Sequence, residues 1–198
     1  MRRTFTILLL ALAAGTCLAS LAFAQAAAST PAPALAKELL NTWNRMGRDV
    51  VDVAEAMPAE KYNFKATPEV RSFAEQLLHI AGSNYLYVDQ AKGQKTGPED
   101  LSSEKYKSKD DIVKVLRESY QAGAAVIGQA TDAQMSESVK TPFGNAMISR
   151  YGFWSAQIRH GAEHYGQLVV YLRLNGIVPP ATARAQARQP QAPPPVKK

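Results

Sequence analysis

Apolar residues recur at alternating intervals of three and four along four segments of the chain, which is the period of an amphipathic helix. The predicted helices cover residues 35–56, the stretch between Pro68 and Gly93, residues 108–130 and residues 149–175. The last and longest carries the stripe Trp154, Ile158, Gly161, Tyr165, Leu168 and Leu172. No stretch alternates apolar with polar residues for long enough to predict a strand. The pattern therefore predicts an all-α body.

Turn and capping residues punctuate this pattern where helices are expected to begin and end. Pro58 follows the first segment, Ser108 with Asp111 resembles a capping box at the start of the third, and Gly176 follows the fourth. Four amphipathic helices of similar length bury their apolar stripes most simply as a four-helix bundle over residues 35–180. The long loop at residues 92–107 allows one crossover connection in place of strict up-and-down order.

The N-terminus has the layout of a secretory signal peptide. Arg2 and Arg3 precede an apolar run, and small residues ending in Ala22-Phe23-Ala24 form an A-x-A cleavage site, which predicts a signal peptide at residues 1–24. The alternative is a single membrane anchor, but the apolar run is short for the roughly 20 residues that a bilayer requires. We therefore expect a periplasmic or secreted protein with no stable membrane anchor. Its single cysteine, Cys17, would leave with the signal peptide, which excludes disulfides and thiolate ligands from the mature chain.

The two ends of the chain account for its basic charge. Six of the 23 basic residues lie there, and the other 17 balance the 17 acidic residues of the body; the six are Arg2, Arg3, Arg184, Arg188, Lys197 and Lys198. A neutral body lacks the positive field that nucleic acid binding requires, so we expect no nucleic acid partner. The lead-in at residues 25–34 and the Pro-, Ala- and Gln-rich tail at residues 181–198 carry few bulky apolar residues, which predicts disorder in both.

Candidate chemistry depends on the three histidines of the chain. His160 and His164 are one helical turn apart, so their side chains leave the same face of the last helix, as in metal-chelating pairs. His79 lies midway along the second helix, away from its apolar stripe, which suits an open site on the side of the bundle more than a buried one. For the pair, spacing alone leaves a metal site and solvated or hydrogen-bonded side chains equally open, whereas for His79 alone it favours a solvated or hydrogen-bonded side chain.

The segment RSFAEQLLHIAGSN around His79, followed by HGAEHYGQLVVYLRLNGIVPP around His160 and His164, resembles the two metal-binding signatures of the DinB/YfiT-like family. The resemblance extends over residues 35–180. It implies a four-helix bundle with a crossover that holds a divalent metal, most often zinc or nickel, with iron or manganese as alternatives. By the same resemblance the ligands are His79, His160 and His164.

Two polar neighbours of the histidine pair are further candidates. Gln167 shares the helical face of the pair and is expected to orient a ligand or bind metal-bound water. Glu163 adjoins His164 but points about 100° away on the helix, so it is expected either on a solvated face or as a general base. His160 to His164 also spell H-x-x-E-H, the pattern of a class of zinc proteases, but Glu163 is the last acidic residue and the downstream glutamate ligand of that class is absent.

Two functions of different class remain open from the sequence. In the first, the metal activates water or a small-molecule substrate in a hydrolase or transferase, beside a pocket lined by Trp43, Asn84, Tyr87 or Trp154. In the second, the metal ties two helices together in a non-catalytic binding or interaction module, with the ligand face covered. A homodimer is expected in the second case and compatible with the first.

Overall fold

Four long helices form the body of the protein in this computed structural model, which describes residues 34–188. They are α2 (Leu35–Ala56), α3 (Phe73–Lys92), α4 (Lys109–Gln129) and α6 (Arg150–Leu174). Each coincides with a segment predicted from the hydrophobic period, so the predicted all-α body is confirmed for its main elements. The smaller elements are the 3₁₀ turn η1 (Ala59–Lys61), α5 (Asp132–Ser136), β1 (Ser138–Lys140), β2 (Met147–Ser149) and α7 (Pro180–Ala187).

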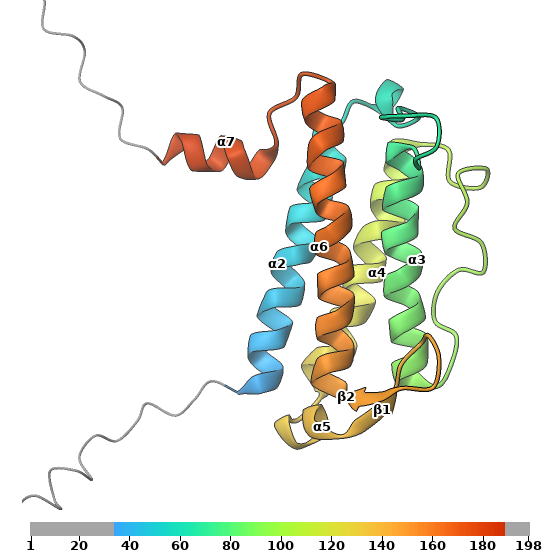
Figure 1. Cartoon of the computed structure of the whole chain (residues 1–198), viewed down its shortest axis with the longest axis vertical. Helices are drawn as coiled ribbons and strands as arrows, with labels where there is room; N and C mark the ends of the chain where they lie inside the picture. Colours follow the sequence, from blue (N-terminus) through green and yellow to red (C-terminus); the bar gives the residue numbers. More distant parts are fainter. Residues whose placement is uncertain (1–33, 189–198) are drawn as a thin grey trace, which may run out of the picture. The chain divides into compact units, whose positions relative to one another are not determined.

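The helix directions follow from contacts at the helix ends. Lys109, at the start of α4, donates to the backbone oxygens of Glu55 and Met57 at the end of α2, so these two helices are antiparallel. The backbone N–H of Ala74, at the start of α3, donates to Tyr62 just beyond the same end of α2. Helices α3 and α4 therefore run parallel, and the loop between them returns along the side of the bundle as a crossover (Figure 1).

The core centres on two tryptophans and a close approach between helices. Trp43 and Trp154 are fully buried, and their rings meet edge to face with centroids 5.4 Å apart. Trp43 Nε1 donates to the backbone oxygen of Tyr120 in α4 at 2.8 Å. A Cβ at Gly123 would lie 2.2 Å from the Trp43 ring, so only glycine allows the indole to lie this close to α4.

Capping residues fix where α3 begins, and so where His79 lies along the bundle. Ser72 Oγ accepts from the backbone N–H of Glu75, and Glu75 Oε2 accepts from the backbone N–H of Ser72 at 2.6 Å. This reciprocal capping box satisfies two N–H groups that the helix itself leaves free. The helix ends at Gly93, whose φ of 65° lies in the left-handed region that glycine adopts without strain.

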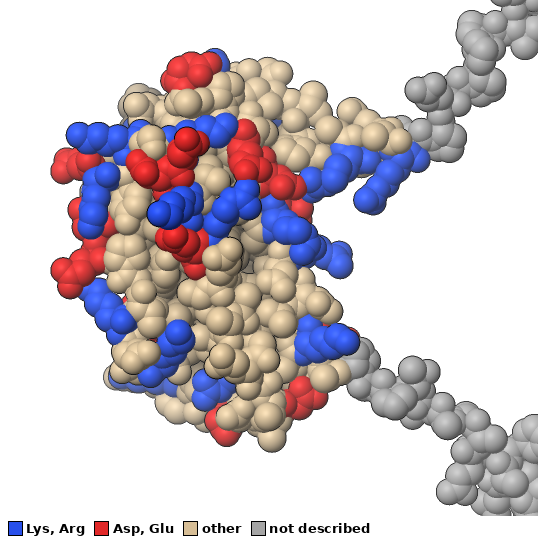
Figure 2. All heavy atoms as spheres, turned by 180° about the vertical axis from the view of Figure 1, so that it is seen from behind, with Lys and Arg blue, Asp and Glu red and all other residues tan. Residues whose placement is uncertain are grey.

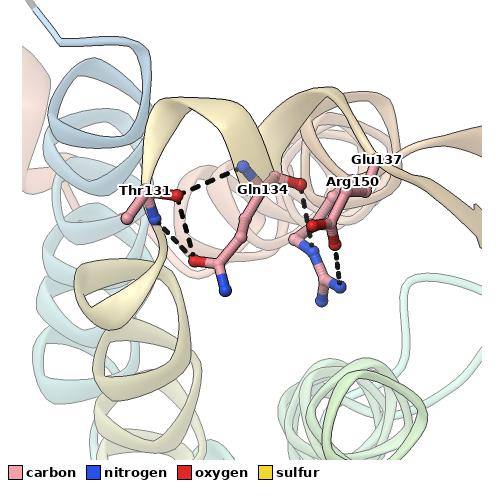
Figure 3. A network of polar contacts seen from close by, with 4 residues as sticks. All are labelled: Thr131, Gln134, Glu137 and Arg150. Atoms are coloured by element: carbon pink, nitrogen blue, oxygen red, sulfur yellow. Dashed lines mark hydrogen bonds and ion pairs between the residues drawn. The ribbon is translucent and has the colours of Figure 1, made fainter.

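A short segment that the sequence pattern missed connects α4 to α6. Strands β1 and β2 pair antiparallel after α5, and Thr131 and Gln134 cap α5 reciprocally (Figure 3). Arg150, the first residue of α6, reaches back to the backbone oxygen of Gln134 and to the Glu137 carboxylate (Figure 3). The prediction that no strand is present was wrong here, because three residues per strand are too few to show an alternating pattern.

Part of the C-terminal tail is helical, so the prediction of disorder from residue 181 onward was wrong for α7. Pro180 occupies the first turn, a position where proline costs no hydrogen bond, and alanine favours the helix. Arg184 forms ion pairs with Asp49 and Asp52 of α2, which attach α7 to the bundle. Residues 1–33 and 189–198 lie outside the described part of the chain, so the predicted signal peptide, most of the lead-in and the end of the tail stay predictions.

The surface bears charges of both signs. On the face drawn in Figure 2, Lys and Arg side chains are interspersed with Asp and Glu, as expected for a body with equal numbers of each. The expected absence of a nucleic acid partner stays a prediction. Within residues 34–188, no helix combines the length and apolar character needed to cross a membrane.

Candidate metal centre

The three histidines meet at the interface between α3 and α6. His79 comes from the middle of α3, and His160 and His164 come from successive turns of α6, which runs antiparallel to it. His160 Nε2 lies 3.2 Å from His79 Nε2 and 3.1 Å from His164 Nε2. One nitrogen from each side chain thus falls within a common group of potential metal ligands, the only group of three or more such residues in the described chain.

The spacing of these nitrogens fits a metal ion. Zinc–nitrogen bonds of about 2.0–2.1 Å at a tetrahedral angle place two ligand nitrogens about 3.3–3.4 Å apart, and at a right angle about 2.9 Å apart. The separations of 3.1 and 3.2 Å lie between these limits. The three histidines would supply three of the four ligands that zinc normally takes, the number that the protein supplies in catalytic zinc sites.

Two glutamines fix the protonation of His164. Its Nδ1 lies 2.8 Å from Gln76 Oε1 and 3.2 Å from Gln167 Oε1, while Gln76 Nε2 donates to Gln167 Oε1 at 2.8 Å. Two oxygen neighbours require Nδ1 to carry the proton, so the lone pair is on Nε2, the nitrogen that faces the other histidines. Gln167 lies where the sequence placed it. Gln76 was missed, although its position three residues before His79, on a neighbouring part of the α3 surface, was available as a clue.

Burial and positive charge keep all three imidazoles neutral. Burial, the nearby Arg71 and the other two histidines together lower the pKa of His79 to about 4. Burial is also the main cause that lowers the pKa of His160 and of His164. Neutral imidazoles are the form that binds a metal, so the site is prepared for ligation at neutral pH.

The cluster lies at the edge of the bundle, as an open site requires. His164 is buried, with 8% of its surface exposed, whereas His79 and His160 are half-buried. His160 Nδ1 is buried and has no hydrogen-bond partner among the described residues. A hollow of about 510 Å³ opens beside His79, and Leu101 and Ser102 of the crossover loop also line it.

The pocket expected from the sequence lies elsewhere. Trp43 and Trp154 are fully buried, and Tyr87 and Asn84 are buried nearly as completely, so all four belong to the packed interior. Asn84 accepts from Gln157 and donates to Ser119. The expectation that these residues line the pocket was wrong, because the hollow opens on the outer side of α3 and the core residues face inward.

Glu163 lies outside the ligand cluster. Its carboxylate binds Arg159 one turn earlier on α6 at 2.8 Å, and 56% of its side chain is exposed. This is the solvated helix face that its direction on α6 favoured. Its negative charge still acts on His160, whose pKa it raises against the larger effect of burial.

Comparison with known proteins adds a family to this geometry. The model of the DinB family matches residues 29–193. Among solved structures, a DinB-like protein from Bacillus cereus ATCC 10987 superposes with a TM-score of 0.63 at 16% identity, covering 73% of this chain and 95% of that one. A DinB-like protein from Bacillus subtilis gives a TM-score of 0.56 at 19% identity, covering 70% and 92%. These two likenesses support the fold alone, and no curated protein gives a significant match.

Proposed function

Because this chain belongs to the DinB family, we propose that it is an exported metalloprotein that binds one divalent ion through Nε2 of His79, His160 and His164. The observation that carries the proposal is the convergence of these three nitrogens from two helices. Three neutral imidazoles suit zinc or nickel, with iron or manganese as alternatives. Export rests on the signal peptide expected at residues 1–24.

We further propose that the ion is catalytic, in a hydrolase or transferase that acts on a small molecule. A bound ion of this kind would supply Lewis acidity to water or to a substrate group. The hollow beside His79 supports this function over a purely structural ion, since a structural site is normally closed on all sides. Gln76 and Gln167 would hold the His164 ring and its proton in place during turnover.

Metal analysis tests the first proposal. The mature protein is stripped with a chelator, reloaded with zinc or nickel and dialysed, and the bound metal is measured beside a His160→Ala variant. We expect about one equivalent in the wild type and a large loss of affinity in the variant. At a metal concentration 100 times the dissociation constant, binding contributes about 2.7 kcal/mol to stability. For a domain of this size that raises the Tm by roughly 5–11 °C.

A Glu163→Gln variant separates binding from catalysis. Glu163 lies outside the ligand cluster, so this variant is expected to bind metal as the wild type does. Hydrolysis of p-nitrophenyl acetate by the zinc form then reports on the catalytic proposal, and a specific fall in Glu163→Gln would assign that residue as general base. Equal, negligible metal content in wild type and His160→Ala would refute metal binding. Metal binding that raises the Tm without any hydrolysis or transfer would favour the non-catalytic alternative.

A further inference from the structure

Two hollows flank the histidine cluster, and Arg71 lines both. The first, of about 510 Å³, contains His79 in its wall. The second, of about 740 Å³, contains Gln76 and Gln167, the two amides that hold His164. Arg71 immediately precedes the Ser72 cap of α3, and its backbone oxygen accepts from the Tyr171 hydroxyl at 2.7 Å, which fixes its backbone against α6.

The guanidinium of Arg71 is available for a ligand. Among the described residues, none of the ion pairs and none of the side-chain hydrogen bonds involves it. Glu69 lines the same two hollows but does not pair with it. The other cation of the first hollow, Lys65, lies 3.6 Å from the Glu75 carboxylate and is therefore already balanced.

Arg71 and one of the histidines share a hollow. Both Arg71 and His79 line the first hollow. An anion bound to Arg71 there would therefore lie beside the metal position. An arginine presents paired N–H donors that match a carboxylate.

We infer that Arg71 binds the carboxylate of a small organic acid whose other end reaches the metal position at His79, His160 and His164. This inference rests on the proposed metal site and specifies its ligand. A monoanion fits better than a phosphate dianion, because the carboxylates of Glu69 and Glu75 also line the first hollow and Arg71 is the one cation in its wall without an ion-pair partner. The apolar side chains of Val70, Leu78 and Leu101 in the first hollow, which has His79 in its wall, would contact the hydrocarbon part of such an acid.

Two hydroxamates that differ in one group test the inference. Succinic acid monohydroxamate carries a carboxylate where butyrohydroxamate carries a methyl group, and both use the hydroxamate to bind the metal. Calorimetric titration of the zinc-loaded mature protein gives both dissociation constants without an activity assay. We expect the wild type to bind the carboxylate compound about fivefold more tightly, as for a partly solvated ion pair. Arg71→Gln should abolish this preference and leave the butyrohydroxamate constant unchanged.

Arg173→Gln is the matched control. It removes the same charge from the last turn of α6, but Arg173 lines neither hollow. This control should keep the wild-type preference. A preference that persists in Arg71→Gln, or is absent from the wild type, overturns the role of Arg71 while metal binding stands. Zinc-loaded protein that binds neither hydroxamate also overturns the inference. Failure of the wild type to bind zinc overturns the proposed function itself, and this inference with it.

Discussion

The amide of Gln76 should set how tightly the three-histidine site binds metal. Gln76→Leu keeps an apolar filler of similar length but removes the oxygen that lies 2.8 Å from His164 Nδ1. A neutral hydrogen bond of this kind contributes about 1 kcal/mol, which is a factor of about five in a dissociation constant. Without this bond the His164 ring and its tautomer are held less firmly, which should increase the loss of zinc affinity to about tenfold. This is the lower end of the usual range for residues that hold a metal ligand in place. Gln167 limits the loss, because its oxygen stays 3.2 Å from the same nitrogen.

Competition with a colorimetric zinc chelator measures this effect directly. Gln76→Glu should act in the opposite direction and tighten zinc binding severalfold, since a carboxylate is a stronger acceptor for the Nδ1–H group and adds negative charge beside the ion. Gln157→Leu is the control: it removes an equally buried amide of the same interface that binds Ser83 and Asn84 and no histidine. It should lower the Tm and leave zinc affinity unchanged. Wild-type affinity in Gln76→Leu would refute the role of this amide.

Three further results are expected. Gly123→Ala should lower the free energy of unfolding by about 1–3 kcal/mol, because the new methyl group would lie 2.2 Å from the ring of Trp43. Gly166→Ala, whose methyl group would have nothing within 4 Å, should raise it by up to about 1 kcal/mol, and equal thermal stabilities of the two variants would contradict the packing. The pKa of His79 falls from 6.5 to about 4 on folding, so the unfolded chain binds more protons than the folded chain between these pH values. The stabilisation of the metal-free protein by neutral His79 should be complete above pH 6.5 and decline toward pH 4, and a Tm independent of pH over this range would refute the shift. Arg184→Gln should speed amide hydrogen exchange in α7 and change the global free energy of unfolding by less than about 1 kcal/mol, as expected for exposed ion pairs. Exchange in α7 as slow as in the wild type would show that these ion pairs do not hold the helix.

The hydrophobic period was sufficient for the helices because each buries one stripe over five or more turns. Trp154, Leu168 and Leu172 of α6 were placed on its apolar stripe and are fully buried. The period could not find β1 and β2, which are three residues long, and it could not show that α7 is anchored, since the partners of Arg184 lie in α2, more than 130 residues earlier. The attachment of α7 depends on a contact distant in sequence, which a local pattern does not contain.

The site was only partly accessible from the sequence. The ligand set came from the resemblance and from the chain having three histidines, and the structure brings their nitrogens together. The pocket prediction was wrong for Trp43 and Trp154 because aromatic composition does not tell on which side of a helix a hollow opens. Arg71 was missed for a related reason: one arginine among many basic residues has no distinguishing pattern until the fold places it beside the cluster.

The α3–α6 interface explains why the site lies where it does. Polar side chains from the two helices pair across it at three successive levels. Each level lies three or four residues further along α3 and three or four residues earlier along α6, as expected for antiparallel helices. The pairs are Gln76 with His164, His79 with His160, and Ser83 with Gln157. The first and third pairs satisfy their hydrogen bonds within the protein, so their burial costs little. The middle level brings nitrogen atoms of neutral imidazoles together, with a third from His164 within 3.1 Å. Lone pairs on nitrogen repel unless a proton or a cation lies between them, and a neutral ring has only one N–H group to place there. The proposed cation would satisfy all three nitrogens at once, and it would hold α3 and α6 in the same register that the neighbouring pairs impose.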